Sequence, residues 1–277
     1  MPQWDLKGLV NPTLGQLNAS PSGQTQSPLE PGWYTDLPNE GTATLQPGGT
    51  GPDGWYQSVT AAAPGSGSVT FSTPGAFTWE VPSGVTRVLA AVWGGGGGGN
   101  NYDTASSGGG GGAYAAALIE VAPGQQIAVT VGQGGSAGNP STAGGNSQCV
   151  VTAGGGGGVV QGGSGGTGGA PGGAVSYATL VSAASGGTGG TGYNSGSAVY
   201  SGGGGGAASA GGAGQGGQPG DTNSNNNTGL GAPGGGVIPA GGNGQRPGST
   251  TPAQAPGGAG TGGSATDGAD GMVMIFW

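Results

Sequence analysis

The chain has 277 residues, of which 77 are glycine and 20 are proline, and its 3 basic and 11 acidic residues give a net charge of −8. Glycine costs about 1 kcal/mol per helical position relative to alanine, so this composition excludes a helical bundle. The scattered basic residues argue against binding to a nucleic-acid backbone, which requires clustered Lys and Arg. The sequence contains no run of about 18 apolar residues, the length that a membrane-spanning helix needs.

The reactive side chains are few. Histidine is absent and Cys149 is the single cysteine, so neither a Ser-His-Asp site, a Cys-His site, an intramolecular disulfide nor a cysteine-based zinc site can form. Catalysis would have to use paired carboxylates, for which Glu80, Asp103 and Glu120 are the candidates. Solvated carboxylates on strands are the ordinary alternative, and we expect a non-enzymatic protein without a cofactor or a metal.

Residues 1–66 are polar and rich in proline and threonine, and they contain a short repeat in which Gly32-Trp33-Tyr34 recurs as Gly54-Trp55-Tyr56. Aromatic side chains in a segment too small for its own core are typical of anchors that bury against a partner or a following domain. A chance repeat is the alternative. The predicted docking anchors are Trp4, Trp33, Tyr34, Trp55 and Tyr56.

From Ser68 onward the pattern indicates β-structure. Apolar and polar residues alternate before and after the turn signal Pro123-Gly124, whereas residues 85–93 are almost continuously apolar, as in a strand buried on both faces. Cys149 falls in a short apolar run and is expected to be buried. The predicted strands are 77–81, 85–93, 117–121, 127–131, 148–152 and 272–277.

A glycine-rich stretch spans residues 153–271, and glycine falls into triplets in 162–174 and 186–191. A period of three matches an extended left-handed helix with three residues per turn, whose bare edges would let neighbouring helices bond laterally. Collagen is disfavoured because the phasing fails at 175–185. Disorder is the main alternative, against which the low charge density argues.

Several interruptions of the glycine runs carry asparagine and tyrosine. Side chains that leave such a lattice are expected at exposed turns, where they could bind sugars by hydrogen bonding and ring stacking or simply form the turns. Asp267 and Asp270 are interpreted as a turn before the last strand, with a bound cation as the weaker alternative. The candidate surface-recognition residues are Asn100, Asn101, Tyr102, Asp103, Tyr193, Asn194, Tyr200, Asn223 and Asn225.

One family resemblance follows from the order of these landmarks. The run from Phe77 to Thr86, the strand ending at Gly94, the block 108–114 and the paired strands around Pro123-Gly124 resemble the glycine-rich domain of bacteriophage tail fibres and minor tail proteins. The closing run Asp270-Gly271-Met272-Val273-Met274-Ile275 is similar to that family's last strand, and Trp4 to Gly8 resembles some tail-fibre starts. The resemblance covers roughly residues 70–277.

The resemblance implies an oligomeric virion protein at the distal end of the tail that sometimes contacts the host surface. We therefore predict an all-β fold: a small jelly-roll-like β-sandwich with an inserted bundle of polyglycine-II-type helices (about 153–271), forming domain 67–277 after an extended N-terminal docking segment, 1–66. The expected partners are other phage tail proteins and a host glycan or protein. They include neither nucleic acid nor a membrane, and a homotrimer is favoured.

The sequence start carries no basic or apolar leader, so synthesis in the host cytoplasm without secretion is expected, and a secreted cell-wall or matrix protein is disfavoured. The remaining alternative is a purely structural part, such as a head-decoration fibre or a tail spacer, that binds no receptor.

Overall fold

The computed structural model describes residues 66–100, 106–159, 164–194, 199–219, 238–245, 252–261 and 266–277. In these residues the fold is all-β: strands and extended segments are present and helices are not. The described residues accordingly offer no helix that is long and apolar enough to cross a membrane. The N-terminal docking segment, with all five predicted anchors, lies outside the described residues.

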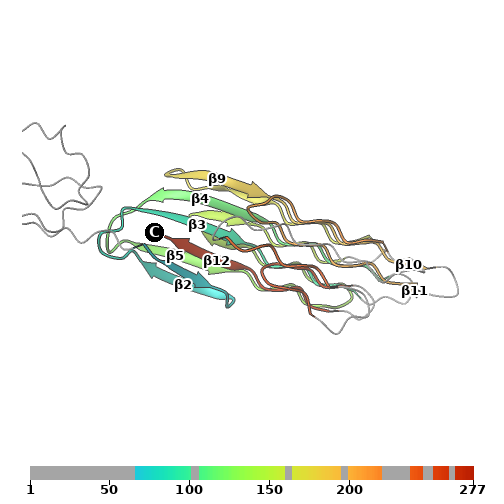
Figure 1. Ribbon diagram of the computed structural model, residues 1–277. Coiled ribbons are helices and arrows are strands. Elements are labelled where there is room, and N and C mark those ends of the chain that lie inside the picture. The colour runs from blue at the N-terminus through green and yellow to red at the C-terminus, as the bar shows by residue number, and fades with distance from the viewer. Residues whose placement is uncertain are drawn as a thin grey trace, which may run out of the picture. The chain divides into compact units, whose positions relative to one another are not determined.

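Two antiparallel sheets of five strands form two layers (Figure 1). The strands of the first sheet, in spatial order, are β1 (Ser68–Phe71), β12 (Met272–Phe276), β3 (Arg87–Trp93), β4 (Tyr114–Glu120) and β9 (Ala178–Ala184). Those of the second are β2 (Gly75–Glu80), β5 (Gln126–Val131), β6 (Ser147–Cys149), β7 (Val151–Ala153) and β8 (Pro171–Ala174). The chain's closing strand thus lies inside the first sheet, between β1 and β3.

The main hydrophobic core fills the space between the two layers. Alternate residues of each strand point into it, including Val92 and Ile275 from the first sheet and Val129 from the second, all at most 1% exposed. A second, smaller cluster lies on the outer face of the first sheet around Trp93 and Tyr114. Both faces of β3 and β4 are therefore largely buried, as the continuous apolar run 85–93 predicted.

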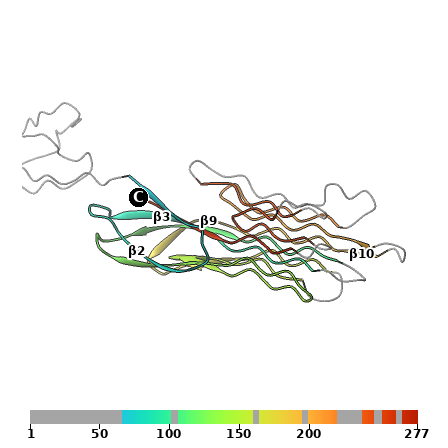
Figure 2. The same ribbon diagram turned by 90° about the horizontal axis from the view of Figure 1, so that it is seen from below.

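Four long glycine-rich connections leave the same end of the sandwich, where the short β1–β2 turn also lies, and the other short turns join the strands at the opposite end. The long connections follow β3, β5, β7 and β9. Figures 1 and 2 show them running side by side away from the sheets toward β10 (Tyr193–Asn194) and β11 (Val199–Tyr200), which pair antiparallel. The predicted insertion, 153–271, was therefore too narrow, because residues 94–100, 106–112 and 132–146 contribute to the same glycine-rich part.

The predicted strands are confirmed with two corrections. Residues 148–152 are not one strand: the chain reverses at Val150 and divides them between β6 and β7. Strands β8 and β9 lie inside the stretch predicted to be only glycine-rich, and the interruption 175–185 that broke the triplet pattern largely coincides with β9. Strands β8 and β9 were not predicted because the segments on either side of them are rich in glycine.

Candidate functional site

Segment 108–113 lies in the interior of the glycine-rich region, where backbone hydrogen bonds join it to six other segments. Its amides donate to three segments in rotation, so that Gly108 and Gly111 reach one neighbour, Gly109 and Gly112 the next, and Gly110 the third. Its carbonyls accept from three further segments with the same period of three. The six neighbours are 94–97, 154–157, 166–169, 187–190, 205–208 and 257–260.

The glycines of this interior leave no space for side chains. Residues 94–100 and 106–113 are all buried. A Cβ added to Gly110 would overlap the carbonyl oxygen of Thr167, and one added to Gly97 would overlap that of Gly157. Backbone therefore packs directly against backbone, and the segments are held at hydrogen-bond distance on all sides. We call these laterally bonded segments the glycine bundle.

The outer segments of the glycine bundle carry one exposed residue in every three. In segment 164–170 the exposed positions are occupied by Ser164, Thr167 and Ala170, whereas Gly166 and Gly169 are buried. Segment 185–191 lies beside it, joined by the bond from the Gly189 amide to the Gly166 carbonyl at 2.8 Å, and exposes serine and threonine with the same spacing. This face is uncharged and can offer hydroxyl groups, but neither an acid nor a base.

The predicted recognition residues that the structure describes fall at the end of the glycine bundle that is distant from the sheets. Tyr193 and Asn194 form β10 and Tyr200 ends β11, with Tyr193 directly opposite Tyr200 in the ladder. The other predicted positions, apart from Asn100, lie outside the described residues: Asn101, Tyr102, Asp103, Asn223 and Asn225. The structure thus brings together the three predicted residues that lie in β10 and β11. Their role in recognition stays a prediction.

Asn100 departs from the predicted exposed position. Its side chain is fully buried, and its Oδ1 accepts a hydrogen bond of 2.7 Å from the Ser107 amide. The Asn100 amide in turn donates to the Ser107 carbonyl. Asn100 therefore ties together the ends of the two interior segments, and within the described part of the chain its Nδ2 has no hydrogen-bond partner. A surface-recognition role for Asn100 itself does not fit this burial.

Asp267 and Asp270 lie in an extended segment of the glycine bundle and not in the predicted turn. The Asp270 carboxylate accepts from the Gly134 amide at 2.8 Å and the Asp267 carboxylate from the Ala137 amide at 2.6 Å. Both aspartates therefore replace backbone carbonyls as acceptors between segments distant in sequence. No group of three or more histidine, cysteine or acidic residues that could hold a metal occurs among the described residues.

The two described carboxylates considered for catalysis are engaged at the sheet ends. Glu80 accepts a hydrogen bond of 2.8 Å from the side-chain amide of Gln126, across the ladder between β2 and β5. Glu120 lies 3.4 Å from the guanidinium of Arg87, and both side chains are largely exposed. The third candidate, Asp103, lies outside the described residues.

Two buried groups have perturbed acidities. Burial raises the pKa of the Cys149 thiol from 9.0 to about 12, and it raises the pKa of the Tyr114 hydroxyl from 10.0 to about 12. Both shifts have the same cause, because a buried site disfavours the charged thiolate and phenolate. Cys149 is thus a protonated core residue and a poor nucleophile.

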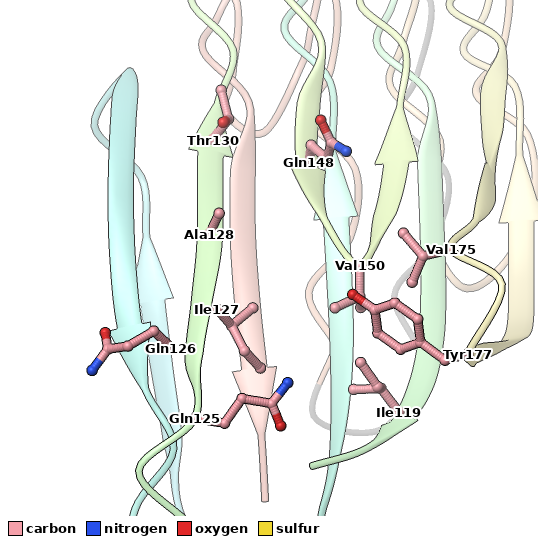
Figure 3. Close-up of a pocket in the computed structure, with 10 residues that line it drawn as sticks. All are labelled: Ile119, Gln125, Gln126, Ile127, Ala128, Thr130, Gln148, Val150, Val175 and Tyr177. Carbon is pink, nitrogen blue, oxygen red and sulfur yellow. The ribbon is translucent and has the colours of Figure 1, made fainter. Parts of the chain in front are cut away.

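A gap in the second sheet is a feature that the sequence did not predict. It is lined by residues of β5, by Val150 at the β6–β7 reversal, and by Val175 and Tyr177 between β8 and β9, and it encloses about 350 Å³ (Figure 3). The sequence carries no signal for it, because the exposure of Tyr177 and the reversal at Val150 appear only in the fold.

Comparison with known families gives one match. Residues 70–277 match the family described as glycine-rich domain. No curated protein matches the sequence. Because the family match spans most of the chain, the chain belongs to the glycine-rich domain family.

Proposed function

We propose that this chain is a non-enzymatic structural protein of a bacteriophage tail: a minor tail, tail-fibre or tail-tip component at the distal end of the virion. The observation that carries the proposal is the six-neighbour hydrogen bonding of segment 108–113. A body braced by backbone bonds on every side resists bending and leaves no room for a substrate cleft inside it. Such stiffness suits a part that projects from a particle. The resemblance of the landmarks from Phe77 to Gly132 to those of phage tail proteins supports the assignment of this part to a phage tail.

We further propose that the glycine bundle is built of polyglycine-II-type helices on a jelly-roll-like sandwich. The support is the repeat of three in both the hydrogen bonds and the exposed positions, which is the repeat of a helix with three residues per turn. Amide hydrogen exchange should show long-lived protection at consecutive glycines such as 108–112, and rapid exchange there would contradict the proposal.

In this proposal two parts of the chain have different partners. Residues 1–66 attach to other tail proteins, and the loops at the distal end of the glycine bundle contact a host glycan or protein. The chain is made in the host cytoplasm and assembles as a homo-oligomer, with a trimer favoured. Deletion of residues 1–66 should abolish incorporation into particles and leave residues 67–277 folded; particles that retain the truncated chain would contradict this arrangement.

Immunogold electron microscopy of phage particles, with an antibody against this chain, tests the location directly. Label at the tail tip is the expected result. Label on the head would favour the alternative, a structural decoration fibre without receptor binding, and unlabelled particles would contradict a virion role.

A further inference from the structure

The gap in the second sheet arises because β5 has a full partner on one side and almost none on the other. β5 pairs with β2 over its whole length, from Gln126 to Val131, but with β6 only at Thr130, opposite Gln148. The β6–β7 hairpin reverses at Val150, so the half of β5 nearest Gln126 has no neighbouring strand on the hairpin side among the described residues.

The free side of β5 presents backbone hydrogen-bonding groups. The Val81 amide donates to the Gln125 carbonyl, so odd-numbered residues of β5 direct their backbone groups toward β2. Because successive residues of a strand alternate in direction, the amides and carbonyls of Gln126 and Ala128 point into the gap. The amide of Gly132, which is even-numbered like Gln126 and Ala128, points the same way and donates to Ser147 Oγ at 2.9 Å. Among the residues that the structure describes, Gln126 and Ala128 have no strand beside them on this side.

The rest of the gap is shaped to receive a side chain. Its floor consists of the apolar core residues Ile119, Ile127 and Val150. Figure 3 shows β5 on one side and Val175 and Tyr177 on the other. Tyr177 is 67% exposed, so a large aromatic ring stands at the rim without being used by the core.

The reversal that keeps the gap open is itself strained. Val150 has a φ of 47°, a left-handed conformation that is costly for a β-branched residue. Strained backbone of this kind persists where the surrounding structure imposes it and concentrates at binding sites. A relaxed turn with glycine or asparagine at this position would have been the ordinary solution.

We propose that this gap is a docking site for an extended peptide, which adds a strand to the open edge of β5 and places an apolar side chain against Ile119 and Val150. No charged residue lines the gap, and the nearby Glu80 carboxylate belongs to β2, on the opposite side of β5, where it accepts from the Gln126 side chain. On a chain with a net charge of −8, this arrangement favours a peptide whose ends are basic and disfavours an acidic one. The assignment is independent of the phage proposal, since it concerns the isolated chain.

The test is a titration of the full chain with a fluorescent peptide of alternating valine and threonine that has lysine at both ends, followed by anisotropy. Saturable binding is expected, and an otherwise identical peptide with glutamate at both ends should bind more weakly. Ala128→Pro removes an amide that faces the gap and not the β2 ladder, so the sheet should tolerate it, while peptide affinity falls about tenfold. Absence of binding by the lysine peptide, or unchanged binding by A128P, would overturn the proposal.

A second variant guards against misfolding of A128P. Tyr177→Ala should also weaken binding, whereas Val181→Ala, at a side chain that is 59% exposed but does not line the gap, should leave the affinity unchanged. Equal losses in both alanine variants would contradict the site. Displacement of the peptide by maltotriose would assign the gap to a neutral sugar instead and overturn the peptide proposal.

Discussion

The sandwich and the glycine bundle are two solutions to the same problem of holding a chain together. In the sandwich, side chains such as Val92 and Ile275 fill the space between two sheets, and burial of apolar surface provides the stabilisation. In the interior of the glycine bundle there are few side chains to bury, and the glycines are held by their own amides and carbonyls. Ordering a glycine backbone costs about 1–2 kcal/mol, and a backbone hydrogen bond returns about 1 kcal/mol net. The balance in the bundle is therefore narrow, and nearly every bond must form.

This difference predicts opposite tolerances. A core packed with side chains can relax around a smaller residue, whereas a lattice of touching backbones has no side-chain rotamers with which to absorb a larger one. Addition of one methyl group to the glycine bundle should therefore cost more than removal of one from the sandwich.

The largest effect is expected for Gly110→Ala. The new Cβ would overlap the Thr167 carbonyl and would disturb the bonds that Gly110 makes with Gly157 and Gly97. Overpacking and the lost hydrogen bonds together predict a loss of about 3 kcal/mol or more in the free energy of unfolding. Denaturant titration of the purified chain measures it, with accumulation of insoluble protein as the extreme outcome.

Gly173→Ala is the matched control, because an added Cβ at this position meets no atom within 4 Å. It should change the free energy of unfolding by no more than about 0.5 kcal/mol. Comparable losses in the two variants would mean that glycine is needed for its backbone freedom and not for close packing, and the comparison drawn above would fail.

Asp270→Ala is expected to have the next largest effect, because it removes a charged acceptor that joins the segment before β12 to Gly134. Loss of such a bond predicts a decrease of about 2 kcal/mol in the free energy of unfolding. Asp270→Asn keeps an oxygen acceptor and should lose less than half as much. Equal losses would show that the charge, and not the hydrogen bond, carries the effect. Hydrogen exchange at the Gly134 amide reports the contact directly.

The two regions also differ in how far the sequence predicts them. The strands of the sandwich follow from alternation of apolar residues, a local signal that placed β5 and β12 well. In the glycine bundle the local signal distinguishes interior from surface: uninterrupted runs such as 94–99 are fully buried, and triplets with a third residue such as 164–170 lie outside. The partners of each segment cannot be predicted in this way, because all glycine segments present the same backbone. This is why residues 94–100 and 106–112 were not assigned to the bundle.

The candidate sites illustrate the same limit. Asn100 was predicted at an exposed turn because asparagine favours turns, but the adjacent buried segments enclose its side chain. The gap beside β5 depends on where the next hairpin, β6–β7, reverses after a long glycine-rich connection, and on the register of one residue pair, Thr130 with Gln148. Neither is encoded near β5. Tyr177 was visible in the sequence, but only its exposure in the fold marks it as unusual.

Alkaline pH should weaken the sandwich through the buried thiol of Cys149. The peptide backbone that holds the glycine bundle has no group that ionises in this way. Because the folded pKa of Cys149 is raised above its ordinary value, stability is fully present below pH 9 and is lost as the pH rises toward about 12. The expected loss is roughly 1 kcal/mol for each pH unit in the lower part of this range, before unfolded Tyr114 begins to ionise. Urea titrations at pH 8 and pH 10 measure it.

Cys149→Ala is the control for this pH effect. It lowers stability at every pH by leaving a small cavity, but it should flatten the decline between pH 9 and pH 10, where Tyr114, with an ordinary pKa of 10.0, contributes little. Parallel pH profiles for the two proteins would show that the decline comes from elsewhere in the chain.

The smallest effect is expected for Ile275→Val, which removes one methylene group from a fully buried side chain in the middle of the first sheet. The lost transfer free energy and the small cavity predict a decrease of about 1 kcal/mol in the free energy of unfolding. That is about a third of the loss predicted when a single methyl group is added at Gly110, although the changes in volume are similar. Calorimetry or denaturant titration of both variants under one set of conditions measures the ratio. A ratio near one would mean that the glycine bundle yields locally as a side-chain core does, and that its backbone lattice is less rigid than its hydrogen bonds imply.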